Sequence, residues 1–250
     1  MGTSASRSGG NAPAGGDWVK AKGRFTRFAR GTGSSVESAV SAFASAIGDV
    51  RSESRGGVGA AGGRAGRLSS SVKAGQALGS FLSGVASEGL DQTLRSFGLG
   101  HLIGKEPHEI LSEIVDYICD NGETLDEAIA RSAVVEVLAE IFSEDDDAYT
   151  DLRDRWDAEF DADRIVDLLS LFLSQAIFQR ILSDLGDLFE KSAVSASEAE
   201  RKEQAVLDFI KGMVAFELGE IDPLDFDWQG SDGEELIRRN VAAALGQLQE

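Results

Sequence analysis

Apolar residues recur at helical spacing along most of the chain after residue 34. Val36, Val40, Phe43 and Ile47 are separated by 4, 3 and 4 positions, which places them on one face of a helix. Similar faces follow, whereas the alternating pattern typical of strands is nearly absent. The pattern predicts an all-α helical bundle. Its helices are expected at about residues 35–48, 69–86, 90–97, 107–119, 125–141, 161–190, 195–218 and 231–248, with 144–157 part loop and part helix.

Capping residues accompany these faces. A Ser or Thr followed three residues later by Glu forms a capping box, in which each side chain accepts from the other residue's backbone N–H. The sequence has this pair at four predicted helix starts: Ser34 with Glu37, Thr124 with Glu127, Ser195 with Glu198, and Ser231 with Glu234.

The first third of the chain has a different composition. Residues 1–33 are rich in Gly and Ser and carry several Arg and Lys, so they bury too little apolar surface to offset the entropy of ordering. We therefore expect three parts: a disordered, basic, Gly/Ser-rich N-terminal tail at 1–33, a single helix plus flexible joint at 34–66, and an acidic helical domain at 67–250.

Net charge also differs along the chain. Residues 1–105 carry 13 Lys or Arg and 6 Asp or Glu, whereas residues 106–250 carry 11 and 37, for a total net charge of −19. A strongly acidic body disfavours nucleic acid. The single cysteine excludes a disulfide framework, and we see neither a secretory signal nor a membrane helix, so we expect a cytoplasmic protein that does not bind membranes.

Motifs for catalysis are weak. The GxGxxG at 57–62 follows a polar segment instead of the strand that a dinucleotide site needs. Asp225 and Asp227 resemble the start of a calcium loop, but its twelfth position is Leu236, so we expect a turn on which Phe226 and Trp228 pack. Cys119 falls on an apolar face and is expected in the core. We predict no enzyme activity, no cofactor and no metal site.

An aromatic and basic segment in the tail suggests binding. Arg24, Phe25, Arg27 and Phe28 interleave charge with aromatic rings, and Trp18 precedes them. Such a segment can bind single-stranded nucleic acid through stacking. Docking on a partner protein or on the chain's own acidic body is the favoured interpretation.

The start of the tail suggests a modification. Removal of Met1 would leave Gly2 with a free α-amine, whose pKa of about 8 makes it a better nucleophile at neutral pH than lysine. The same residues fit an N-myristoylation pattern and also an ordinary terminus.

Three stretches resemble the QatB family of the bacterial Qat anti-phage defence system. They are Met1–Ser4 with its Gly/Ser-rich continuation, Arg24–Phe28, and Gly89–Gly100 running on to Gly122–Arg131, and the similarity spans most of residues 1–142. The resemblance implies a defence role beside an ATPase, a QueC-like enzyme (QatC) and a TatD-like nuclease.

QueC-like enzymes activate a 7-deazaguanine carboxylate with ATP and couple it to an amine. The resemblance therefore implies a non-enzymatic subunit whose Gly2 is modified, with Thr3 and Ser4 orienting the tail and with Trp18, Arg24, Phe25, Arg27 and Phe28 binding the partner. The alternative function is a nucleic-acid-binding adaptor that uses the basic aromatic tail.

Overall fold

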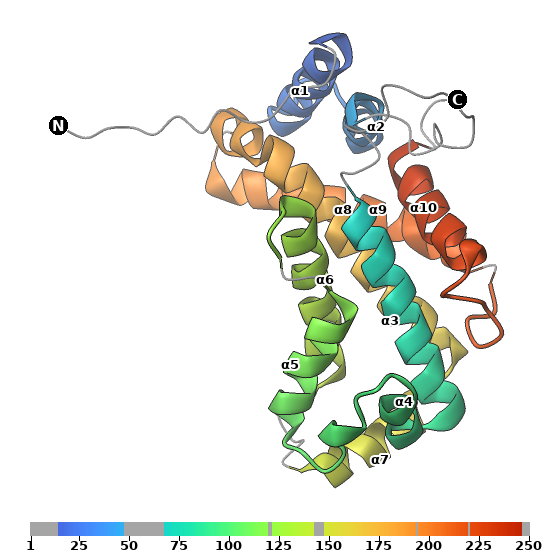
Figure 1. Cartoon of the computed structure of the whole chain (residues 1–250). Coiled ribbons are helices and arrows are strands. Elements are labelled where there is room, and N and C mark those ends of the chain that lie inside the picture. Colours follow the sequence, from blue (N-terminus) through green and yellow to red (C-terminus); the bar gives the residue numbers. More distant parts are fainter. Residues whose placement is uncertain are drawn as a thin grey trace.

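The computed structural model describes residues 15–47, 68–119, 122–142, 148–193, 195–219 and 221–246. Within these residues every element is helical, which confirms the all-α prediction (Figure 1). The elements are α1 (Gly15–Ala29), α2 (Val36–Ile47), α3 (Ser69–Glu88), α4 (Leu90–Ser96), the 3₁₀ turn η4 (Gly100–Leu102), α5 (Pro107–Ile118), α6 (Leu125–Ile141), α7 (Tyr149–Glu159), α8 (Ala162–Ser192), α9 (Ala196–Leu218) and α10 (Ser231–Gly246).

The longest helix, α8, forms the centre of the bundle. It contacts α1, α3, α6, α9 and α10, and Ile165, Leu169 and Phe172 are fully buried. Ala162–Leu188 is long and apolar enough to cross a membrane by length and composition, although no membrane helix was predicted from the sequence. Of an apolar 18-residue stretch in this segment, 56% is buried inside the protein, as in the core helix of a bundle.

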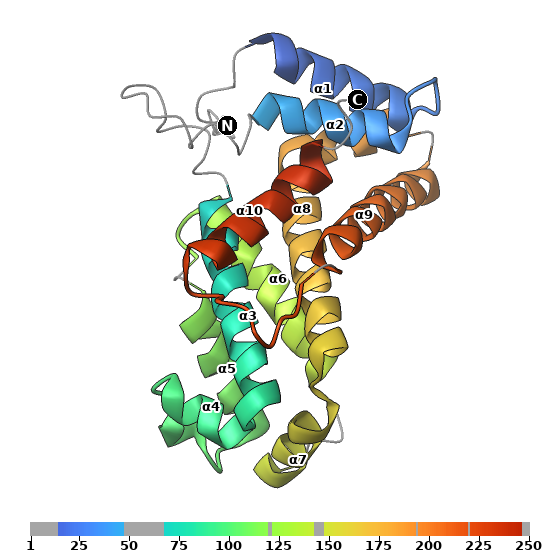
Figure 2. The same ribbon diagram turned by 90° about the vertical axis from the view of Figure 1, so that its right-hand side faces the viewer.

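The remaining helices gather at two ends of this core. The α1–α2 hairpin covers one end, and α4 and α7 lie at the other (Figure 2). Helix α9 packs against α8, while α10 contacts α2, α3 and α9. The hairpin is thereby attached to the last two helices of the chain as well as to the central one.

Helix starts agree with the predicted caps at two of four positions. Thr124 and Glu127 form the full capping box, and Ser195 accepts from the backbone N–H of Glu198 at 3.3 Å. At α2 the cap is Ser35, whose Oγ accepts from the N–H of Ser38, so the prediction for Ser34 was one residue early. Helix α10 begins at Ser231 itself, and the N–H of Glu234 bonds the carbonyl of Gly230.

A long-range cap begins α3. The Asp126 carboxylate, from α6, accepts from the N–H of Ser70 at 2.6 Å and from the hydroxyl of Ser71 at 3.0 Å. Asp126 is only 5% exposed, and this desolvation raises the pKa of its carboxyl group although both hydrogen bonds lower it. A single buried side chain thus joins two helices of the bundle.

The structure corrects the extent of the predicted tail and shows how the segment after it packs. Residues 1–14 lie outside the described residues, but Gly15–Ala29 form a helix, so the predicted disordered tail does not extend to residue 33. The helix predicted at the start of 34–66 is α2, and it packs on the bundle, because Val40 and Phe43 belong to the same buried cluster as Leu78 of α3. The reason is that α1 and α2 complete each other's apolar faces, which neither segment could bury alone. The flexible joint predicted after α2 lies outside the described residues.

Candidate partner-binding site

The residues predicted to bind a partner fall into two groups. Gly2, Thr3 and Ser4 lie outside the described residues. Trp18, Arg24, Phe25, Arg27 and Phe28 all lie in α1. The structure therefore brings together one half of the predicted site, on the hairpin that covers the end of the bundle.

Phe25 and Phe28 point into the protein's own core. They are 1% and 5% exposed. The ring of Phe25 meets that of Phe43 edge-on, with 6.4 Å between centroids, and the ammonium of Lys202 in α9 lies 4.6 Å from the Phe28 ring centroid. Of the interpretations left open, the structure has both rings docked on the chain's own body. In this structure neither ring is exposed to a partner or to stacked bases.

Two of the charged residues of α1, Lys20 and Arg24, face a groove between α1 and α2. It encloses about 530 Å³, and its lining residues are Lys20, Arg24, Ser35, Glu37, Ser38, Ser41, Ala42 and Ser45. Arg24 donates from Nη1 to the Ser38 hydroxyl, so its guanidinium is held across the groove. A hydrogen bond with the Ser35 side chain lowers the pKa of Glu37, which keeps this carboxylate ionised.

Most of these lining residues were not singled out from the sequence, although a signal was present. Ser35, Ser38, Ser41 and Ser45 follow each other at spacings of 3, 3 and 4 residues, which is one helix face. The apolar stripe of α2 had already defined the opposite face. What the sequence did not supply was the second wall, since Lys20 and Arg24 were assigned to a tail.

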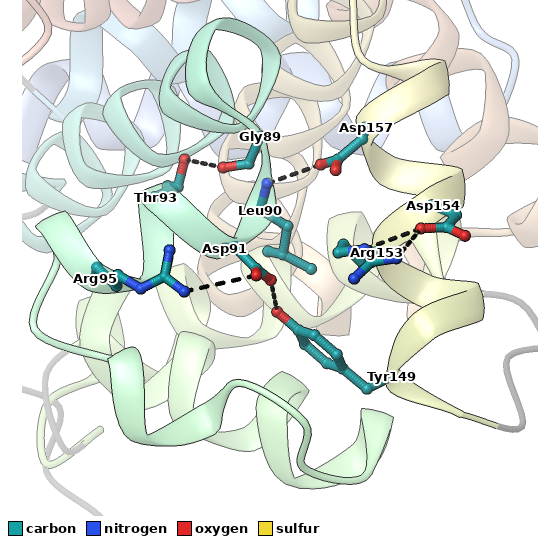
Figure 3. A network of polar contacts seen from close by, with 9 residues as sticks. All are labelled: Gly89, Leu90, Asp91, Thr93, Arg95, Tyr149, Arg153, Asp154 and Asp157. Atoms are coloured by element: carbon teal, nitrogen blue, oxygen red, sulfur yellow. Dashed lines mark hydrogen bonds and ion pairs between the residues drawn. The ribbon is translucent and has the colours of Figure 1, made fainter.

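The segment Gly89–Gly100, which carried much of the family resemblance, is held by polar contacts at the other end of the bundle. Figure 3 shows the Asp157 carboxylate of α7 facing the N-terminus of α4, where it accepts from the Leu90 N–H at 2.8 Å. Tyr149 donates to Asp91, and Thr93 donates to the Gly89 carbonyl at 2.8 Å. Burial and the Asp91 carboxylate both raise the pKa of Tyr149, so its hydroxyl stays a donor. These contacts join α4 to α7.

Other candidate sites have structural roles or none that the structure defines. Cys119 is buried in the core cluster, and Trp228 is buried on the bundle with Phe226 beside it; both predictions are confirmed. Asp227 accepts from the N–H of Gly230. In the described part of the chain, no three His, Cys, Asp or Glu side chains are placed to hold a metal ion. The glycine motif at 57–62 lies outside that part.

Comparison with known families decides the identity. The family described as "Qat anti-phage system associated protein QatB" matches residues 59–247. The chain belongs to the QatB family. No curated protein and no solved structure matches it.

The QatB match covers a different part of the chain from the resemblance. It covers α3 to α10, including the residues after 142, to which the resemblance did not extend. It does not include α1 and α2. The QatB match thus associates the bundle with anti-phage defence, and the hairpin packs on that bundle.

Proposed function

We propose that this chain is a non-enzymatic subunit of an anti-phage defence complex and that its Gly2 amine is the acceptor for a QueC-like enzyme. The observation that carries the proposal is membership of the QatB family, together with the sequence Met1-Gly2-Thr3-Ser4 ahead of α1. The system's ATPase and TatD-like nuclease are further proposed partners, and the cytoplasm is the proposed location.

The proposed reaction is an acyl transfer. The enzyme activates the carboxylate of a 7-deazaguanine with ATP, which forms an acyl adenylate and releases pyrophosphate. The Gly2 nitrogen attacks the acyl carbon, the new amide bond forms, AMP leaves and the nitrogen loses a proton. An unbranched residue at this position lets the backbone nitrogen approach closely.

The tail has enough length to reach another protein's active site. Gly2 is 13 residues before Gly15, where α1 begins. Such a segment spans at most about 45 Å when it is fully extended. The bundle can therefore remain outside the enzyme while its first residues enter the active site.

Mass spectrometry of the N-terminal peptide tests the proposal. Cells that contain the QueC-like enzyme should yield the peptide with the added deazaguanine acyl group on Gly2, and cells without the enzyme should not. Gly2→Leu should abolish both modification and defence, because a bulky second residue retains Met1. Cys119→Ala is the control and should be modified normally. An unmodified Gly2 in cells that mount full defence would contradict the acceptor role.

The alternative adaptor function loses its main support. Stacking on bases needs exposed rings, whereas Phe25 and Phe28 are buried. The remaining cations of α1 lie on a chain whose residues 106–250 carry 37 acidic and 11 basic residues, which repels a polyanion.

A further inference from the structure

The hairpin carries the opposite charge to the rest of the protein. Residues 15–47 contain five Lys or Arg and two Asp or Glu, whereas residues 106–250 contain 11 and 37. An acidic segment of another protein is therefore repelled by most of the bundle and attracted to the α1–α2 end. Charge alone directs such a segment to the end of the molecule at which α1, the first described helix, lies (Figure 2).

The groove between α1 and α2 has the chemistry to hold carboxylates. Lys20 and Arg24 are four residues apart on α1 and both line it. Ser38 lines the facing side, and its hydroxyl, which accepts from Arg24, can donate its own proton to a carboxylate oxygen. Because Arg24 is already held by Ser38, less side-chain entropy is lost when a ligand binds.

The size and the charge pattern of the groove favour a short peptide. Its volume of about 530 Å³ accommodates a few side chains. Glu37 also lines the groove, and its ionised carboxylate repels an anion at that point. Two cations beside one acid suit one or two carboxylates, whereas nucleic acid binding depends on many phosphate contacts in a row.

We propose that this groove docks a short acidic segment of the enzyme that modifies Gly2, an inference that rests on the proposed function. Lys20 lies five residues into α1, about 8 Å along the helix from Gly15. A segment bound there holds the enzyme beside the origin of the tail. Docking raises the effective concentration of Gly2 at the active site, because the two are then joined by a short linker.

Charge variants of the full chain test the docking. Lys20→Glu should raise the KM for Gly2 modification about tenfold, since a favourable charge pair becomes a repulsive one. Lys22→Glu is the matched control: it makes the same change on the same helix, outside the groove, and should alter KM less than about twofold. Glu37→Gln should lower KM about two- to threefold, because a repulsive charge is removed.

Two further readings separate docking from a structural effect. The kcat of all three variants should match the wild type, because the groove does not touch the reacting atoms. The difference between Lys20→Glu and wild type should shrink in about 0.5 M NaCl, where exposed charges are screened. Hexaglutamate should compete with the purified enzyme for wild-type protein and not for Lys20→Glu.

Isothermal titration calorimetry measures binding of the purified enzyme to the chain. Together with the modification assay, it separates a failure of the docking proposal from a failure of the proposed function. Binding that Lys20→Glu weakens, without any modification of Gly2, supports the docking and overturns the proposed function. Modification with equal KM and equal affinity for wild type and Lys20→Glu overturns the docking alone. No binding and no modification overturns both. A single-stranded oligonucleotide that binds through Lys20, while enzyme binding is unchanged, overturns the docking in favour of nucleic acid.

Discussion

Gly89 is a position at which one added methyl group should both strain the backbone and disturb a helix cap. It lies between α3 and α4 with φ +79° and ψ 164°, a region that only glycine occupies readily. A Cβ at this position would lie 3.1 Å from Asp157 Oδ1, the atom that accepts from the Leu90 N–H (Figure 3). Gly89→Ala therefore imposes a strained backbone and also displaces the carboxylate that caps α4.

The magnitude follows from these two effects. The backbone strain costs about 2 kcal/mol, and loss of the charge-assisted hydrogen bond to Leu90 costs about 1.5 kcal/mol. We expect the free energy of unfolding to fall by about 3.5 kcal/mol. With an m-value of about 3 kcal/mol per M, the urea midpoint falls by about 1.2 M.

Two variants separate the effects. Gly98→Ala is the matched control, since Gly98 also has a positive φ, +75°, but open space around its Cβ position; it should cost about 1 to 2 kcal/mol. Asp157→Ala should cost about 1.5 kcal/mol by itself. In the double variant the lost hydrogen bond counts only once, so the cost stays near 3.5 kcal/mol instead of the additive value of about 5.

Urea unfolding followed by far-UV circular dichroism measures the stability of the three single variants and the double variant relative to wild type. If Gly89→Ala lowers the free energy of unfolding no more than Gly98→Ala does, the contact with Asp157 contributes nothing and the predicted loss of the α4 cap is refuted. Additive costs for Gly89→Ala and Asp157→Ala would equally show that the two residues do not act on one hydrogen bond.

Three further changes test other parts of the fold. Phe43→Ala removes a fully buried ring that contacts Phe25 and should destabilise the protein by about 3 to 5 kcal/mol, with faster proteolysis within 15–47; equal proteolysis would mean that the hairpin does not depend on this contact. Thr124→Ala removes the α6 cap and should cost about 1 kcal/mol in urea unfolding, a loss absent if the capping box contributes nothing. Asp126 has a pKa raised above its ordinary value of 3.8, so the folded protein binds this proton more readily than the unfolded chain does. Wild type should therefore gain stability relative to Asp126→Asn as pH falls from 7 to about 4, and parallel curves would contradict the desolvation argument.

Helix positions were predictable because they depend on local pattern. The apolar faces located α3, α5, α8 and α9 to within a few residues, and the Thr124–Glu127 pair identified the start of α6. The predicted cap positions at α2 and α10 were wrong by one residue. Adjacent serines at 34 and 35 offer the same chemistry, and only the backbone conformation selects between them.

The α1 helix shows why the candidate site was only half predictable. Its sequence is rich in Gly and charge, and by itself it buries too little to fold. It becomes a helix because Phe25 and Phe28 complete a core formed with α2, α8 and α9, which lie up to about 190 residues away in the chain. No local window contains that information.

The sequence by itself determined the all-α class, most helix boundaries, the acidic bundle and the family. Each of these follows from composition or from a period of 3.6 residues, which are properties of neighbouring positions. Only the tertiary structure decided which aromatic rings are buried and which cations face a groove. Arg24 and Phe25 are adjacent in the chain, yet one lines the groove and the other lies in the core. That difference depends on which face of α1 meets α2 and α8, because burial of apolar area stabilises only the orientation that places the rings inside.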